Sequence, residues 1–205
     1  MTWQSGAREK RKSQMGDYFQ TIVDREVSTA EAQTLASTIR DWLITEQIVE
    51  GTPTDCILGS DGGYAPGSHF EEVLAQPDIN TRRLRTNGLE IDVGRTVFHA
   101  GQFGLELICP QCGARSDRKS LGIGSEMHAL WGKAVDEWYF DRGPGILACA
   151  RCGQAISVVD WCYDPPWGFG NLGFTFWNWP SIKESFVTEM SRRLGHRSVL
   201  VRGKI

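Results

Sequence analysis

The spacing of apolar side chains predicts a strand and then a helix in the first quarter of the chain. Residues 18–23 (Tyr-Phe-Gln-Thr-Ile-Val) are rich in aromatic and β-branched side chains, which is typical of a strand. The sequence Ser-Thr-Ala-Glu at 28–31 is a capping box, and the apolar residues behind it recur at helical spacing. We therefore expect a helix over residues 29–46 that ends before Gly51.

A helix followed by a strand is also predicted near the other end of the chain. The sequence Ser-Ile-Lys-Glu at 181–184 is a second capping box. The apolar face of this helix consists of Ile182, Phe186, Val187, Met190 and Leu194. Gly195 stands where a helix-ending glycine belongs, and residues 198–202 (Ser-Val-Leu-Val-Arg) have the composition of a closing strand.

Short apolar segments in the middle of the chain predict the remaining strands. They are residues 89–92, 95–99, 105–108, 156–161 and 172–177. The order of strand, helix, strands, helix and strand predicts an α+β fold, in which a mostly antiparallel sheet carries two flanking helices. A ferredoxin-like split β-α-β core is one specific version of that fold.

One more helix is predicted between two cysteine pairs. Its apolar residues fall at helical offsets of 0, 3, 4, 7, 8 and 11, and they are Met127, Leu130, Trp131, Ala134, Val135 and Trp138. The sequence Gly-Pro-Gly at 143–145 ends this helix. An amphipathic helix is therefore inserted between the two pairs.

Two Cys-x-x-Cys-Gly sequences flank this inserted helix and predict a metal site. The predicted ligands are Cys109, Cys112, Cys149 and Cys152. Two residues between cysteines let one tight turn present both sulfurs to one ion, and Gly113 and Gly153 tolerate the positive φ of such a turn. Four thiolates fill a tetrahedral zinc site and leave no position for a reactive water, so we expect one structural Zn²⁺. A redox dithiol is the alternative, but that motif usually occurs as a single pair.

The predicted elements divide the chain into four segments. These are a basic tail at 1–14, the N-terminal part of the α+β domain at 15–104, a zinc-ribbon module with its helical insertion at 105–160, and the C-terminal part of the domain at 161–205. The tail has four basic and few apolar residues, so we expect it to be disordered. The module is thus expected to interrupt the domain.

Composition and charge favour a cytoplasmic protein. The formal net charge is −3, which argues against a large, uniformly basic surface for nucleic acid. Six cysteines, four of them in the paired motifs, fit a reducing compartment better than a disulfide scaffold. The N-terminus lacks the apolar stretch of a signal peptide, and no run of about 18 apolar residues predicts a membrane span.

The sequence contains no recognisable catalytic motif. The patterns H-E-x-x-H, G-x-S-x-G and the phosphate-binding P-loop are all absent. Residues 59–67 are rich in glycine but lack the Gly-Lys-Ser/Thr ending of a phosphate cradle, so we interpret them as a turn. We therefore expect a protein that is not an enzyme, and an uncharacterised enzyme is the third choice.

The most aromatic segment, residues 161–179, supplies the candidates for a partner-binding surface. An exposed aromatic cluster beside a rigid metal module would anchor a protein partner. The candidates are Trp167, Phe169, Trp177 and Trp179. The alternative partner is nucleic acid, because aromatic rings can also stack on bases. The basic residues that would support this alternative are Arg115, Arg118, Lys119 and Arg151.

The two cysteine motifs, Cys-Pro-Gln-Cys-Gly at 109–113 and Cys-Ala-Arg-Cys-Gly at 149–153, resemble the knuckles of zinc ribbons. The resemblance covers about a quarter of the chain and implies a bound zinc ion without implying an activity. In its mild acidity and lack of catalytic motifs, the whole chain is similar to small bacterial immunity proteins, which bind and block a cognate toxin. That likeness implies a protein partner, with a toxin as one candidate.

Overall fold

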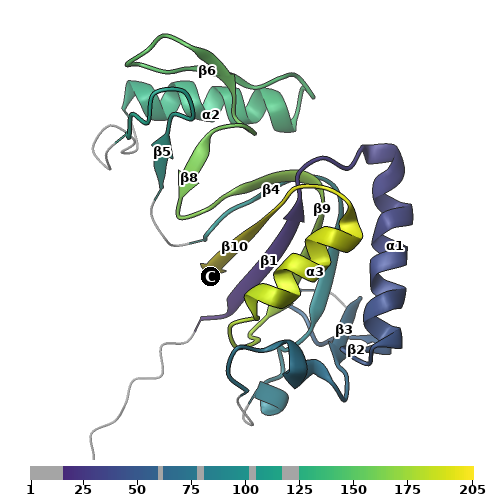
Figure 1. The fold of residues 1–205 in the computed structure, drawn as a ribbon. Helices are drawn as coiled ribbons and strands as arrows, with labels where there is room; N and C mark the ends of the chain where they lie inside the picture. Colours follow the sequence, from purple (N-terminus) through teal and green to yellow (C-terminus); the bar gives the residue numbers. More distant parts are fainter. Residues whose placement is uncertain (1–15, 60–61, 78–80, 102–104, 117–124) are drawn as a thin grey trace, which may run out of the picture.

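The chain is described by a computed structural model, which covers residues 16–59, 62–77, 81–101, 105–116 and 125–205. Figure 1 shows a curved sheet with two helices on one side and a smaller module beyond one end of it. The first half of the chain contributes β1 (Tyr18–Asp24), α1 (Thr29–Thr45), β2 (Val49–Thr54), β3 (Gly63–Pro66), two single-turn 3₁₀ helices (Phe70–Val73 and Thr81–Arg83) and β4 (Leu89–Phe98). The second half contributes β5 (Glu106–Ile108), α2 (Glu126–Tyr139), β6 (Ile146–Ala148), β7 (Ala155–Ser157), β8 (Cys162–Asp164), β9 (Gly168–Trp177), α3 (Glu184–Leu194) and β10 (Ser198–Lys204). The predicted tail, 1–14, lies outside the described residues.

Within the described ranges, the main sheet has six strands in the order β10-β1-β9-β4-β3-β2, and every pair is antiparallel. The connection from β1 to β4 contains α1 and the edge strands β2 and β3, and β9 lies between β1 and β4 in the sheet. The helix α3 leads from β9 to β10, and β1 lies between them. Each helical connection therefore crosses one strand, which is a split β-α-β arrangement. The predicted α+β fold with a mostly antiparallel sheet is confirmed.

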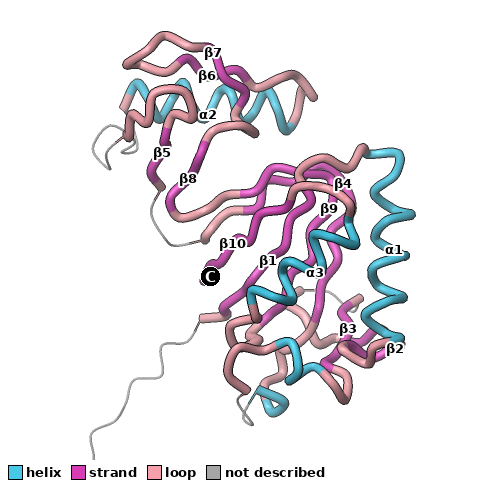
Figure 2. Tube along the Cα trace, viewed as in Figure 1, coloured by secondary structure: helices cyan, strands magenta, loops and turns pink. Residues whose placement is uncertain are grey.

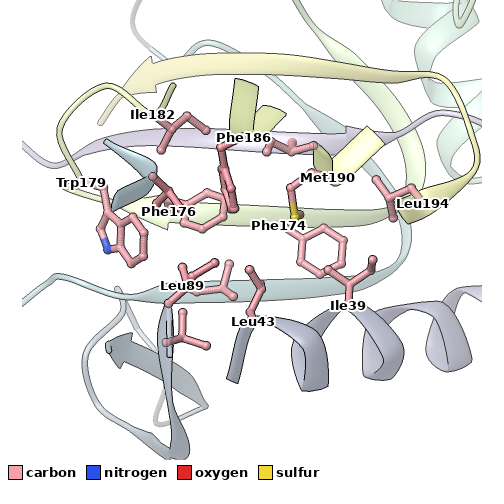
Figure 3. Packing of buried hydrophobic residues seen from close by; sticks show 14 of the residues in the cluster. Ile39, Leu43, Leu89, Phe174, Phe176, Trp179, Ile182, Phe186, Met190 and Leu194 are labelled. Atoms are coloured by element: carbon pink, nitrogen blue, oxygen red, sulfur yellow. The ribbon is translucent and has the colours of Figure 1, made fainter. Parts of the chain in front are cut away.

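Both α1 and α3 cover the same face of the sheet, where the larger hydrophobic core lies. Alternate residues of each strand point to this face. Ile22 of β1 and Phe174 and Phe176 of β9 are fully buried there. Figure 3 shows these rings between side chains of the two helices: Ile39 and Leu43 of α1, and Phe186, Met190 and Leu194 of α3. Burying a side chain of this size contributes about 1.5–3 kcal/mol to the free energy of folding. Packing against this face of the sheet therefore holds both helices in position.

The helices begin where short polar side chains can satisfy their free N–H groups. Ser28 accepts a hydrogen bond from the backbone N–H of Glu31 and donates one to its carboxylate, as the first capping box predicts. The second capping box is wrong. The helix α3 begins one residue after Lys183, which makes no side-chain cap bond, because Ile182 is held in a β-bridge with Leu74. In the described part of the chain, none of the helices is both long enough and apolar enough to cross a membrane.

The smaller module consists of α2 and two short antiparallel strand pairs, β5 with β8 and β6 with β7 (Figure 2). The strand predicted over 156–161 is shorter than expected, because the chain turns after β7. A second hydrophobic core fills the module; its buried members are Leu107, Cys109, Ala134, Trp138, Leu147, Cys149, Ile156, Val158, Trp161 and Phe169.

Side chains from the sheet strands join the module to the main domain. The ring of Phe169, on β9, packs edge-to-face against Trp138 of α2 with centroids 5.2 Å apart. The guanidinium of Arg95, on β4, lies 4.1 Å from the centre of the same tryptophan ring. Arg25, just after β1, donates a hydrogen bond to the carbonyl of Val159. The module is therefore packed on the sheet as well as tethered to it.

Candidate metal centre

The two Cys-x-x-Cys-Gly sequences form nearly identical turns at the ends of two short hairpins. In the first turn, the N–H of Cys109 donates to the carbonyl of Ala114, and the N–H of Gly113 donates to the carbonyl of Cys109. The second turn repeats both bonds at positions 149–154. The two glycines have φ of 67° and 71°, in the left-handed region that favours glycine. The local sequence therefore shapes each knuckle independently.

The fold brings the four predicted ligands together. Their sulfur atoms all lie within 4.8 Å of one another. Two of the Sγ–Sγ distances are 3.9 Å, between Cys109 and Cys152, and 3.8 Å, between Cys112 and Cys149. Four sulfurs about 2.3 Å from a tetrahedrally coordinated zinc ion would be about 3.8 Å apart. The donor set and its spacing therefore fit a tetrahedral metal ion, and these residues form a four-cysteine cluster within metal-binding distance.

Backbone N–H groups in the second knuckle favour a thiolate. Those of Cys152 and Arg151 point to the sulfur of Cys149 and lower its pKa to about 6. The pKa of Cys152 moves the other way, to about 11. The N–H of Gln154 lowers it, but desolvation and the three neighbouring thiols outweigh that effect. Four thiols this close cannot all lose their protons at neutral pH unless a cation compensates their charge.

The helix α2 spans the distance between the two knuckles in the chain. Its N-cap is Ser125, whose hydroxyl accepts from the N–H of His128. Its buried residues, Ala134 and Trp138, face the hairpin that carries the second knuckle. The turn before that hairpin passes so close that a Cβ on Gly145 would lie 2.6 Å from the carbonyl oxygen of Ala134. The helix α2 and the hairpin of the second knuckle therefore form one packed unit with the cysteine cluster.

The four residues predicted to bind a partner lie in different environments. Phe169 and Trp179 are core residues, with only 2% and 4% of their surfaces exposed. Neither side chain offers a surface to a partner, because each ring is packed against other aromatic rings. Trp167 and Trp177 are half-buried. Trp167 lies against Trp131 and Tyr163 in the module, and Trp177 lies on the helix-free face of the sheet.

The sequence interpretation missed a different exposed aromatic pair, Tyr139 and Phe140, at the end of α2. They are 40% and 70% exposed, and their rings meet edge-to-face with centroids 4.8 Å apart. A signal for them was present. Trp138, Tyr139 and Phe140 are consecutive, and successive helical positions diverge by about 100°, so one apolar face cannot bury all three. Ile146, at the start of β6, is also 45% exposed.

Comparison of the chain with protein-family models, with curated proteins and with solved structures finds no match in any of the three. The likeness to zinc-ribbon knuckles therefore rests on the four cysteines and their geometry. The likeness to immunity proteins has no match that supports it. The fold and the site define an α+β protein with a module whose four cysteines lie within metal-binding distance of one another.

Proposed function

We propose that this chain is a zinc-binding protein without catalytic activity, in which the metal fixes the module and the module binds another protein. The closed set of four cysteines carries the proposal. Each thiolate occupies one tetrahedral position, so a bound zinc ion would keep no open site for water or substrate. Cys109 and Cys149 are also buried, with 1% and 4% exposed, which suits a structural ion.

The metal content provides the first test. We expect about one zinc per chain and little iron in protein purified under reducing conditions, because borderline-soft Zn²⁺ suits a four-thiolate site. Elemental analysis by plasma mass spectrometry measures both metals in one sample. Purification from a culture supplied with zinc and iron equally controls for metal supply. A metal content near zero, or one iron in place of zinc, would contradict the proposal.

The exposed apolar residues of the module support a protein partner. Tyr139, Phe140 and Ile146 lie at the end of α2 and the start of the next strand. Aromatic residues that are exposed in the free protein and supported by a rigid core are typical anchors of protein interfaces. A cognate toxin is the partner that we propose first, since a protein that only binds can act as an inhibitor.

Replacing Phe140 tests this surface. Phe140→Lys should weaken the complex about 30-fold or more, as the loss of about 2 kcal/mol at an interface anchor does. Lysine suits the C-terminal end of a helix, so the change should leave α2 intact. The matched control is Leu84→Lys, because Leu84 is an exposed apolar residue too, at 50%, but lies outside the module.

The measurement begins with affinity capture from the native host and identification of a protein retained in a 1:1 ratio. Binding of that protein to the wild type and to both variants is then compared by calorimetry. Retention by the Leu84 variant together with loss by the Phe140 variant would support the proposed surface. Equal binding by both variants would remove the module's aromatic pair as the anchor.

The nucleic-acid alternative has less support on the described residues. Arg115 and Arg151 are exposed, but the guanidinium of Arg115 lies 3.2 Å from Glu106 and 3.5 Å from Asp164. These carboxylates compensate its charge and would compete with a phosphate group. The other two basic candidates, Arg118 and Lys119, lie outside the described residues. Capture of nucleic acid without protein in the experiment above would favour this alternative.

A further inference from the structure

The sheet face opposite α1 and α3 has a small pocket, which is built on the main domain. Its volume is about 250 Å³. Its lining comes from three adjacent strands, β1, β9 and β4, from His99 just after β4 and from Ile205 just after β10. The lining includes Phe19, Thr21, Glu90, Asp92, Phe98 and Trp177.

A chain of hydrogen bonds forms the floor of this pocket. Thr21 and Thr175 are paired across β1 and β9, and their hydroxyl oxygens are 2.9 Å apart. The hydroxyl of Thr175 also donates to a carboxylate oxygen of Asp92 at 3.4 Å. The two threonines are 1% and 5% exposed, so the floor is buried and polar. Burying a hydroxyl costs free energy unless the hydroxyl makes hydrogen bonds. Here the two threonine hydroxyls bond each other, and that of Thr175 positions the carboxylate of Asp92.

Aromatic rings form the walls. The rings of Phe19 and Trp177 are 5.4 Å apart between centroids. The indole N–H of Trp177 donates to Glu90 at 2.7 Å and fixes the orientation of both side chains. On the other side, the ring of Phe98 occupies the space above Gly173, where a Cβ would lie 2.4 Å from two ring atoms. Because Gly173 has no side chain, the ring of Phe98 can lie against the strand there and form one wall of the pocket.

The lining of the pocket contains two acidic side chains. Glu90 and Asp92 both lie on the same face of β4, two residues apart. Burial and the neighbouring charge of Glu90 raise the pKa of Asp92 to about 6. Among the described residues that line the pocket there is no lysine or arginine, and His99 is the only other titratable side chain. The two carboxylates thus have no cationic partner within the pocket.

We propose that this pocket binds the head group of a small organic cation, an alkylammonium or alkylguanidinium ion, between the aromatic walls and the Glu90–Asp92 pair. Aromatic faces attract such cations, and the attraction grows when the cation leaves water. The two carboxylates supply charge-assisted acceptors. The volume lies below the range of about 300–1,000 Å³ for drug-sized ligands, which favours a short cation over a nucleotide. This site is separate from the proposed function and does not depend on zinc.

The test uses the full-length, zinc-loaded protein and simple probes. Butylammonium and ethylguanidinium chlorides are titrated at pH 8 and followed by NMR of the tryptophan indole N–H groups, with 1-butanol and butyrate as neutral and anionic controls. We expect saturable shifts at the indole of Trp177 with the cations and none with the controls. A lysine blocked at both backbone ends separates two sources of the cation. If the blocked lysine binds more tightly than butylammonium, the cation that the pocket recognises is a protein side chain. If it binds more weakly, the cation is a free amine.

Matched variants locate the site. Glu90→Gln and Asp92→Asn keep their hydrogen-bonding shapes and should each weaken binding about tenfold or more, as the loss of a charged acceptor does. Glu50→Gln, at an exposed position of β2, is the control and should bind as the wild type does. Circular dichroism establishes that each variant is folded. The proposal is overturned if butanol binds as well as the cations, or if all three variants bind equally.

Binding should also weaken between pH 8 and pH 5. The carboxyl of Asp92 gains a proton over this interval, which removes an acceptor. His99 is another titratable side chain at the site. Glu90 is the third titratable side chain at the site. The Asp92→Asn variant separates these contributions, because it should lose most of the pH dependence while His99 stays in place. An unchanged pH profile in this variant would remove Asp92 from the site.

Discussion

Cys109→Ser should release the metal and unfold the module while the main sheet stays folded. Structural zinc contributes about 10–16 kcal/mol to folding in zinc-finger peptides, which is comparable with the whole stability of about 5–15 kcal/mol of a typical domain. A serine hydroxyl does not supply the anionic sulfur that this site is shaped to present. The core beneath α1 and α3 contains none of the four cysteines, so it should survive the loss.

Metal analysis measures the loss of zinc, and limited proteolysis measures the unfolding of the module. The variant should retain less than about a tenth of the wild-type zinc. Trypsin should cleave after Lys133, Arg142 or Arg151 in the module, while cleavage after Arg40 of α1 stays slow. Cys162→Ser is the matched control, because Cys162 is exposed on β8 and lies outside the cluster. A variant that holds one zinc per chain and resists cleavage in the module would refute the assignment of Cys109 as a ligand.

The metal cluster could be predicted from the sequence because its geometry is mainly local. The Cys-x-x-Cys spacing and the glycine after each pair determine one turn, and the turn presents two sulfurs. The two turns meet through a long-range contact. That contact could be predicted because one tetrahedral ion needs the sulfurs of both turns. The inserted helix was predictable for a similar reason, since its apolar residues recur at helical spacing. Leu130, one of the six residues of the predicted face, is exposed.

The edges and faces of the sheet were less predictable. The strand β2 contains Gly51 and Pro53, both unfavourable in strands, and its pairing with β3 shifts register between Val49 and Pro53. The glycine-rich segment interpreted as a turn contains β3, because tertiary pairing overrides a weak local preference. Alternation along 172–177 predicted a strand, but it could not say which face α1 and α3 would cover. That choice buries Phe176 and leaves Trp177 beside the pocket.

The pocket itself could not be predicted from local pattern. Thr21, Asp92 and Thr175 are far apart in the sequence and meet only through the pairing of β1, β9 and β4. A threonine in a strand is ordinary, and a Glu-x-Asp sequence in a strand is typical of a solvated edge. Only the strand order makes these residues neighbours.

Asp24→Ala should lower the free energy of unfolding by about 3 kcal/mol, as removal of a buried, charged acceptor does. Asp24 is 0% exposed at the end of β1. One carboxylate oxygen accepts from the N–H groups of Glu26 and Val27, both at 2.9 Å, and the other lies 2.8 Å from Nδ1 of His196. This carboxylate therefore ties the start of α1 to the turn between α3 and β10. Urea unfolding of the variant at pH 6 measures the loss.

The pH dependence separates the two roles of Asp24. The hydrogen bond to Asp24 raises the pKa of His196 above its usual value of 6.5. A histidine with a raised folded-state pKa contributes stability that is fully present below pH 6.5 and is lost as the pH rises through the folded-state value. Asp24→Asn keeps an oxygen for the backbone N–H groups but loses the charge, so its deficit relative to the wild type should be larger at pH 5.5 than at pH 8.5. His196→Gln should abolish that difference between the two pH values. A deficit in Asp24→Asn that is the same at both would show that the backbone bonds, and not the histidine, account for the contribution of Asp24.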